Sequence, residues 1–461
     1  MQIHPWIRNT LAVFCTAVLA SGALADTQYV GSGTCGGLSP CNATIQDAVD
    51  AATVPADIRI LPGTYADPVD LSSLNADMQG DIVLQAINPD DTAAVDTATI
   101  TGSFTAALDG DFSGNIELRG LSFETSDQGV FLGTQSGDVS LFNVSVTGVG
   151  TEFEELSVSL NGTSSFTAQD VTTTGSNADG ISLTVEEGAS VYTVEMERVT
   201  SSNNSSSGFA LATTLLPEDE AVVNLTMTDI TANENGGDGI FATSTAGNMM
   251  LSNITANGNG DEGIDLEDAL NVTLNQITAN GNDGRGIEVD AEIMLTASNI
   301  VVQNNGEEGM LIEGATQDLD GVINILGDVM VTSIQTTGNA DGIVFENASA
   351  NNTLVIRSAT IAGNTRAGIF IDGNSDSDAV VDATGNFWGN ASGPTHPGNP
   401  GGTGDVVADA ANPIDDATGI VLYSNFISGS TAIPLLGLPG LVLLMLVLAT
   451  LAIRRLHQPA R

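Results

Sequence analysis

The central part of the sequence repeats itself with a period of 23 residues. Thr255-Ala256-Asn257-Gly258-Asn259 returns as Thr278-Ala279-Asn280-Gly281-Asn282, and Gly263-Ile264 returns as Gly286-Ile287. A fixed period of this length indicates stacked structural units, each of which contacts only its neighbours. Similar pairs of glycine and an apolar residue continue the pattern at wider spacing: Gly180-Ile181, Gly208-Phe209, Gly239-Ile240, Gly309-Met310, Gly342-Ile343 and Gly368-Ile369.

Apolar and polar residues alternate after each glycine. Ile264 and Leu266 share one side of the chain, as do Ile287 and Val289. A period of two predicts a strand with one buried face, and no stretch between the glycines has the period of a helix. A second strand is expected before each Asn-rich turn, at Met249–Leu251, Val272–Leu274, Leu295–Ala297 and Val329–Val331. Such units stack with their strands parallel, about 4.8 Å apart, around an interior of apolar side chains.

Asparagine occupies the position four residues before the glycine in six units: Asn204, Asn235, Asn259, Asn282, Asn305 and Asn364. Asparagine tolerates left-handed backbone angles, and its amide can bond to the copies above and below. With these asparagines, the units resemble the right-handed parallel β-helix family, the fold of pectate lyases and of many bacterial surface proteins. The resemblance covers most of residues 120–390. It implies an all-β chain with a right-handed parallel β-helix solenoid, which we place at residues 55–425.

The two ends of the predicted solenoid differ in sequence from its body. Residues 44–52 place Ile45, Ala48 and Val49 on one side of a helix, which is expected to cover the N-terminal end of the core. Residues 26–54 would form this cap together with a loop closed by a disulfide between Cys35 and Cys41, the only cysteines outside the first 25 residues. The loop 385–405 is expected to close the other end, with Trp388 packed inside it.

The first and last residues have the composition of targeting segments. Residues 1–25 combine an early arginine, an apolar run and Ala-Leu-Ala at the end, which predicts a secretory signal peptide cleaved before Asp26. Residues 426–461 contain an uncharged run from Ala432 to Ile453, about 33 Å long as a helix and therefore long enough to cross a membrane. Arg454 and Arg455 follow it and place the body of the chain outside the cytoplasm.

This C-terminal segment resembles the IPTL-CTERM and PEP-CTERM sorting signals of Gram-negative surface proteins. Ile433, Pro434 and Leu436 match the proline motif, although Leu435 replaces its threonine and Pro439 stands where tryptophan is usual. The matching glycine and the arginine pair are Gly440, Arg454 and Arg455. The resemblance implies a cell-surface location and a membrane sorting enzyme as a partner, whereas a permanent transmembrane helix is the alternative.

The charge of the chain restricts its partners. Asp and Glu number 57 against 10 Lys and Arg, for a net charge of −47. Such a surface repels DNA, RNA and anionic lipid, so nucleic acid is excluded as a partner. It suits divalent cations, or it serves to keep the protein soluble.

Two pairs of carboxylates follow the central glycines and are predicted to point outward. Asp265 and Glu267 lie on one strand, and Glu288 and Asp290 lie on the next. Like charges stacked on adjacent strands repel, and oxygen-rich patches suit Ca²⁺. We therefore predict a Ca²⁺ site at these four residues, with an ordinary solvated acidic face as the alternative.

Catalytic signatures are sparse. Arg285 is expected among carboxylates, either as an ion pair or, by resemblance to pectate lyases, as the base of a Ca²⁺-dependent lyase. His396 is the only histidine outside the end segments and lies in a loop beside Pro397, which argues against a Ser-His-Asp triad. The sequence thus predicts an exported surface β-helix with a structural, adhesive or glycan-binding role, whose partner would be an extracellular polysaccharide. The alternative is a Ca²⁺-dependent polysaccharide lyase or another glycan-active enzyme on the same fold.

Overall fold

The computed structural model describes residues 25–427, apart from 32, 34, 72–79, 90–97, 108–113, 126–128, 135–136, 149–155, 162–163, 186–190, 214–221 and 314–327. The predicted signal peptide and sorting segment therefore lie outside the described residues, including Ile433, Pro434, Leu436, Gly440, Arg454 and Arg455. Within the described part of the chain, no helix has the length and apolarity needed to span a bilayer.

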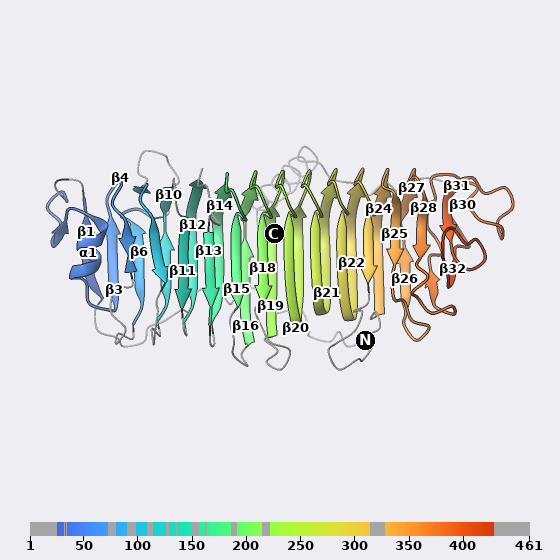
Figure 1. The fold of residues 1–461 in the computed structure, drawn as a ribbon, viewed down its shortest axis with the longest axis horizontal. Helices are drawn as coiled ribbons and strands as arrows, with labels where there is room; N and C mark the ends of the chain where they lie inside the picture. The colour runs from blue at the N-terminus through green and yellow to red at the C-terminus, as the bar shows by residue number, and fades with distance from the viewer. Residues whose placement is uncertain are drawn as a thin grey trace, which may run out of the picture.

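The chain winds into a parallel β-solenoid whose coils follow one another along a single long axis (Figure 1). Each central coil contributes to three sheets, and all pairs between the named strands are parallel. The first sheet begins each coil, directly after the Gly-apolar pair. Its members, in stacking order, are β5 (Val69–Asp70), β8 (Phe104–Ala107), β11 (Val130–Thr134), β13 (Leu156–Leu160), β15 (Ile181–Val185), β18 (Phe209–Thr213), the first parts of β20 (Ile240–Thr255), β21 (Ile264–Asn280) and β22 (Ile287–Gln303), then β23 (Met310–Glu313), β25 (Asp341–Phe345), β28 (Ala367–Ile371) and β31 (Gly404–Ala408).

The second sheet follows the first in each coil. It stacks β1 (Asp26–Val30), β3 (Ala56–Ile60), β6 (Ile82–Ala86), β9 (Ile116–Arg119), the first parts of β12 (Val139–Gly148) and β14 (Ser165–Thr174), β16 (Val191–Glu197), the first part of β19 (Val222–Thr231), the middle parts of β20 to β22, β24 (Asp328–Thr337), β26 (Leu354–Arg357), β29 (Val380–Asp382) and β32 (Ile420–Leu422). β1 already belongs to this stack, although it lies in the segment that the sequence assigns to the cap.

The third sheet leads into the Asn-rich turn. It stacks β4 (Gly63–Tyr65), β7 (Ala98–Ile100), β10 (Leu121–Thr125), the last parts of β12 and β14, β17 (Thr200–Ser202), the last parts of β19 to β22 and of β24, and β27 (Thr360–Ala362). Two short strands lie outside the three stacks: β2 (Cys41–Asn42) pairs with β1, and β30 (Pro394–Thr395) pairs with β31.

The interior is the predicted column of apolar side chains. Ile264, Ile287, Ile343 and Ile369 are fully buried, and Met310 continues the column between Ile287 and Ile343 in parallel register. The parallel solenoid predicted from the repeat is therefore confirmed. The hydrophobic effect accounts for its coherence, because each coil buries its apolar face only against the coils on either side.

The buried asparagines form a continuous ladder. The Nδ2 of Asn259 donates to Asn282 Oδ1 at 3.1 Å, and Asn282 donates in the same way to Asn305 at 3.1 Å. Each Oδ1 also accepts the backbone N–H of the preceding asparagine, as in Asn259 N to Asn282 Oδ1 at 2.9 Å. Sequence analysis missed one member, Asn339, because it stands three rather than four residues before its glycine. The ladder ends on Asp405, which accepts from Asn364 Nδ2 at 2.8 Å.

The repeated glycines are explained by this ladder. A Cβ on Gly263 would lie 2.6 Å from Asn282 Nδ2 and 2.6 Å from the carbonyl oxygen of Gly286. Only glycine therefore allows the asparagine side chain to pass beneath the next coil. The left-handed backbone that we expected at the ladder asparagines occurs elsewhere: it falls at the bend between the second and third sheets, for example at Asn253 (φ 56°) and Gln276 (φ 57°).

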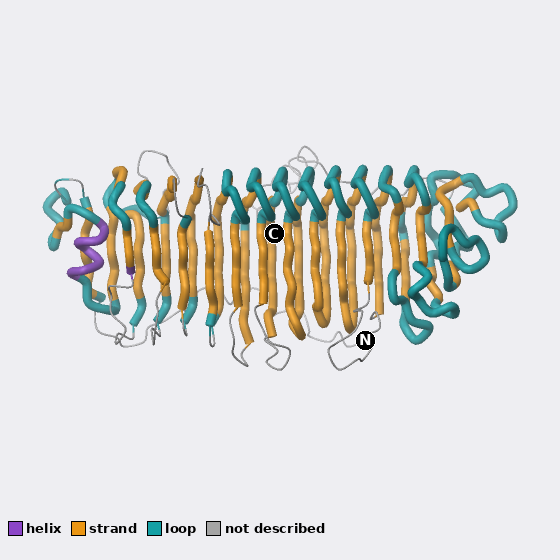
Figure 2. The backbone as a smooth tube through the Cα atoms, in the orientation of Figure 1, coloured by secondary structure: helices purple, strands orange, loops and turns teal. Residues whose placement is uncertain are grey.

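The only described helix, α1 (Ile45–Ala51), lies at the N-terminal end of the solenoid (Figures 1 and 2). Thr44 caps it by accepting the Asp47 N–H at 3.0 Å, and Ile45, Ala48 and Val49 join the main apolar core. Cys35 and Cys41 form a disulfide beside it, with a Cα–Cα distance of 5.7 Å. At the opposite end of the chain, Trp388 is fully buried in the same core.

Candidate ligand-binding face

The outer face of the first sheet carries most of the predicted site residues. Because side chains alternate along a strand, burial of Ile264 and Leu266 turns Asp265 and Glu267 outward. Asp265 pairs in register with Glu288 of the next coil. We call this region the acidic surface, and its members are Asp238, Asp261, Glu262, Asp265, Glu267, Arg285, Glu288, Asp290, Glu308, Glu313 and Glu346.

A bulge interrupts the stripe that the sequence predicts. Leu266 pairs with Val289, but the next pair is Ala269 with Ala291. Glu267 and Asp268 of β21 therefore share the space opposite Asp290 alone. Asp290 is in register with Glu313 of β23, so the stripe resumes on the following coil.

Arg285 lies at the centre of the acidic surface and contacts carboxylates on three coils. Its Nη1 lies 3.0 Å from Glu262 and 2.8 Å from Glu288, and its Nε lies 3.0 Å from Glu308. Burial opposes the charge of Arg285, but the neighbouring carboxylates outweigh burial and raise its pKa. The guanidinium therefore stays protonated, which fits the ion-pair alternative and leaves it unable to act as the base of a lyase.

Several carboxyls of the acidic surface hold their protons unusually strongly. Burial, and then the charges of Glu288 and Glu267, raise the pKa of Asp265 to about 8. Burial and Asp261 raise the pKa of Glu262 to about 8, and burial and Glu346 raise the pKa of Glu313 to about 7. Desolvation and like charges act in the same direction here, because each disfavours the ionised form.

One oxygen of Asp265 is left without a partner. Its Oδ1 is buried and makes no hydrogen bond to the protein. A buried acceptor without a donor costs free energy, and a cation, a water molecule or the hydroxyl of a ligand would remove that cost. The acidic surface is therefore suited to a ligand that brings positive charge or hydrogen-bond donors.

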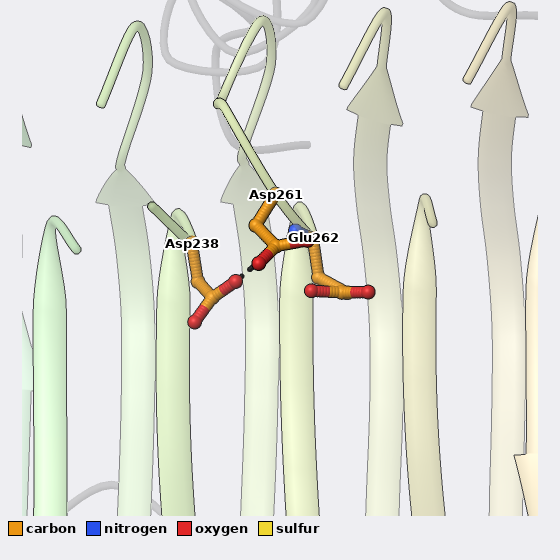
Figure 3. A group of neighbouring side chains, drawn as sticks. All are labelled: Asp238, Asp261 and Glu262. Atoms are coloured by element: carbon orange, nitrogen blue, oxygen red, sulfur yellow. Dashed lines mark hydrogen bonds between the residues drawn. The ribbon is translucent and has the colours of Figure 1, made fainter. Parts of the chain in front are cut away.

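A tighter group of carboxylates lies beside the predicted four. Asp238, Asp261 and Glu262 bring one oxygen each to within 4.8 Å of one another (Figure 3). The Glu262 N–H also donates to Asp238 Oδ1 at 3.0 Å. In the part of the chain with a described structure, this is the one group of three potential ligands that is so close, so Asp265, Glu267, Glu288 and Asp290 do not gather in this way. Sequence analysis missed the group, although the adjacent acids Asp261-Glu262 before Gly263 marked its position.

His396 belongs to a separate network near the C-terminal end of the solenoid. Its Nε2 lies 3.1 Å from Asp409 Oδ1, and its Nδ1 lies 2.7 Å from the Tyr423 hydroxyl. The Gly398 N–H also donates to Nδ1 at 3.0 Å. Both ring nitrogens thus face partners other than serine, so this histidine does not form a Ser-His-Asp triad with described residues.

Comparisons with known proteins agree on the fold. A family model described as right handed beta helix region matches residues 156–322. The chain is accordingly an all-β, right-handed parallel β-solenoid. No curated protein matches the sequence.

Among solved structures, the A-module of the Azotobacter vinelandii mannuronan C-5 epimerase AlgE6 is 14% identical, covers 84% of this chain and 94% of its own, and has a TM-score of 0.46. Pectate lyase Pel9A is 14% identical over 69% of this chain and 81% of its own, with a TM-score of 0.32. The AlgE4 A-module from the same Azotobacter species is 15% identical over 72% and 94%, with a TM-score of 0.36. Likeness at this level carries no information about the activity of this chain.

Proposed function

We propose that this protein is an exported β-solenoid of the bacterial surface that binds extracellular polysaccharide, with Ca²⁺ as a link between anionic sugars and the acidic surface. The observation that supports the proposal most is the packing of carboxylates around Arg285 on a rigid sheet, with Asp265 Oδ1 buried and unpaired. Rigid oxygen ligands at close spacing suit Ca²⁺, and a bound ion would relieve repulsion between stacked carboxylates.

The residues that would hold the ion are Asp238, Asp261 and Glu262, whose oxygens lie within 4.8 Å of one another. The sequence-predicted four, Asp265, Glu267, Glu288 and Asp290, are the competing position. Bound Ca²⁺ supplies positive charge that can be shared with the carboxylates of a uronic-acid polymer. The affinity expected for an extracellular module is in the range of about 10⁻⁴ to 10⁻³ M.

The test compares Ca²⁺ with Na⁺ at matched ionic strength. We expect Ca²⁺ to raise the melting temperature further than Na⁺, because an ion that binds only the folded state stabilises it. Asp238→Asn/Asp261→Asn should abolish the extra stabilisation, whereas Glu267→Gln/Asp290→Asn should retain it if the three-residue group is the site. Retention of a uronic-acid polymer should then depend on Ca²⁺ in the wild type. Equal stabilisation by both ions would refute the proposal and leave an ordinary solvated face.

One observation favours a second candidate, a glycan-active enzyme. The pKa of Asp265 near 8 keeps this carboxyl protonated at neutral pH, and it lies on the strand next to Glu288. An acid beside a carboxylate is the pairing that glycoside hydrolysis requires. Release of products from the polymer in the same assay, lost in Asp265→Asn, would identify the protein as an enzyme.

The ends of the chain supply the cellular part of the proposal. The leader would export the chain, and the apolar run followed by Arg454 and Arg455 would hold it at the membrane, at least until a sorting enzyme acts. The helix α1 would then serve as the cap of the solenoid, since it lies at the end where the core would otherwise meet solvent.

A further inference from the structure

A line of hydroxyl side chains runs along the outer face of the third sheet. Its members are stacked in parallel register over successive coils, and each is the direct partner of the next. In order they are Thr64, Thr99, Ser122, Ser145, Thr172, Thr200, Thr231, Thr255 and Thr278. At about 4.8 Å per coil, the line extends for roughly 38 Å along the solenoid axis.

These hydroxyls lack partners in the described part of the protein, whereas the polar groups beside them are paired. No side-chain hydrogen bond joins any of the nine to another described residue. In the neighbouring column, by contrast, Ser202 Oγ accepts the Asn233 N–H at 3.1 Å, and Asn257 Oδ1 accepts the Asn280 N–H at 2.8 Å. That column ends at Asn280, whose Oδ1 is buried and accepts no hydrogen bond. The third sheet thus presents a regular row of unused donors and acceptors on a fixed frame.

The same region is free of charge in a strongly acidic protein. From Thr172 to Asn280 the two columns contain only Thr, Ser and Asn: Thr172, Thr200, Thr231, Thr255 and Thr278 in one, and Thr174, Ser202, Asn233, Asn257 and Asn280 in the other. The chain as a whole has a net charge of −47. An uncharged polymer can approach this surface without the cost of dehydrating carboxylates, which the acidic surface would impose.

We propose that these two columns, the hydroxyl surface, bind an extended, uncharged polysaccharide that lies along the solenoid axis. The step between coils is close to the length that one pyranose unit adds to an extended chain, so successive sugars meet successive hydroxyls. Each hydrogen bond exchanges with water and is weak alone, but many made at once by one polymer give useful affinity. The inference rests on the proposed polysaccharide-binding function and assigns a second class of polymer to a different face.

The experiment measures binding of the full chain to a soluble neutral β-glucan in the presence of a chelator. Thr231→Val/Thr255→Val/Thr278→Val removes three adjacent hydroxyls while keeping shape and β-propensity. The matched control, Thr226→Val/Thr273→Val/Thr296→Val, makes the same change at outward positions of the second sheet, where exposed Met250 and Met330 interrupt the row. We expect the dissociation constant to rise about tenfold in the first variant and to change less than about twofold in the control.

Three results would overturn the inference: no binding of the wild type to the neutral polymer, equal loss in both variants, or a change of oligomeric state in place of polymer binding. The single variant Thr255→Val gives the same test with a smaller effect, should the triple variant not reach the wild-type melting temperature. Because the chelator removes Ca²⁺, failure here leaves the Ca²⁺-dependent binding of uronic-acid polymer untouched, and failure of that binding leaves this result standing.

Discussion

At the scale of single residues, the position of the acidic surface follows from two simple regularities. A period of 23 residues makes Asp265 and Glu288 register partners, and the alternation of a strand turns both outward. The bulge opposite Asp290 could not be predicted, because it depends on one additional residue between Leu266 and Ala269 whose effect appears only once the register is known. The contact of Arg285 with three coils is likewise a consequence of side-chain reach rather than of spacing.

The raised pKa of Asp265 predicts that stability falls with rising pH. The carboxyl has a pKa of about 8 in the folded protein and an ordinary value near 3.9 in the unfolded chain, so the folded state binds its proton more tightly. This contribution is fully present below the unfolded value and is lost progressively as pH rises towards 8. The melting temperature, measured with a chelator present, should therefore decrease from pH 5 to pH 9.

Asp265→Asn tests this origin of the pH dependence. The amide does not titrate, so the variant should be more stable than the wild type at high pH and should lose part of the slope. Asp283→Asn is the control, since this exposed acid lies in the neighbouring turn and the change should leave the slope intact. An unchanged slope in Asp265→Asn would show that the other carboxyls of the acidic surface determine it.

At the scale of strands and turns, the sequence was informative wherever a pattern repeated. Alternation after each glycine located the first sheet, and the apolar pairs before each turn located the second. The third sheet was not foreseen, because Thr-Ala-Asn was interpreted as part of a turn, although Thr255 and Thr278 end strands β20 and β21 in register. The hydroxyl surface was missed for the same reason.

The asparagine ladder gives a prediction about these turns. Asn282→Ala would leave the Asn259 N–H and Nδ2 without their acceptor inside the core. Buried donors that lose their acceptor cost about 1–3 kcal/mol each, so the free energy of unfolding should fall by at least that amount. Chemical denaturation measures it.

Asn271→Ala is the matched control for the ladder. Asn271 also donates to an asparagine of the preceding coil, at 2.8 Å to Asn248 Oδ1, but this pair lies on the exposed face of the second sheet. Water can replace an exposed partner, so the change should cost less than about 1 kcal/mol. Equal losses in the two variants would mean that the buried ladder does not stabilise the fold more than an exposed one.

At the scale of the whole molecule, the sequence predicts the solenoid and its direction better than its ends. Stacked coils contact only their neighbours, so a local pattern is enough to determine the architecture. The closure near the C-terminus depends on contacts between distant residues, such as His396 with Asp409 and Tyr423, and no periodicity reveals them. The targeting segments lie outside the described residues, and their roles stay predictions.

The last prediction concerns the attachment of the whole molecule to the membrane. Residues 433–461 follow the last described residue, Ile427, so a chain that stops at Ala432 keeps every described strand. The removed segment contains most of the uncharged run together with Arg454 and Arg455, the features expected to insert and orient a membrane helix. The remaining solenoid is strongly acidic, and anionic lipid should repel it. We therefore expect the truncated protein to move from the membrane fraction to the periplasm or medium, with the melting temperature of the solenoid unchanged. A variant with leucine in place of Pro434 and Pro439 serves as the control, because it keeps the apolar run and should stay with the membrane. Retention of the truncated chain in the membrane fraction would show that another part of the protein anchors it.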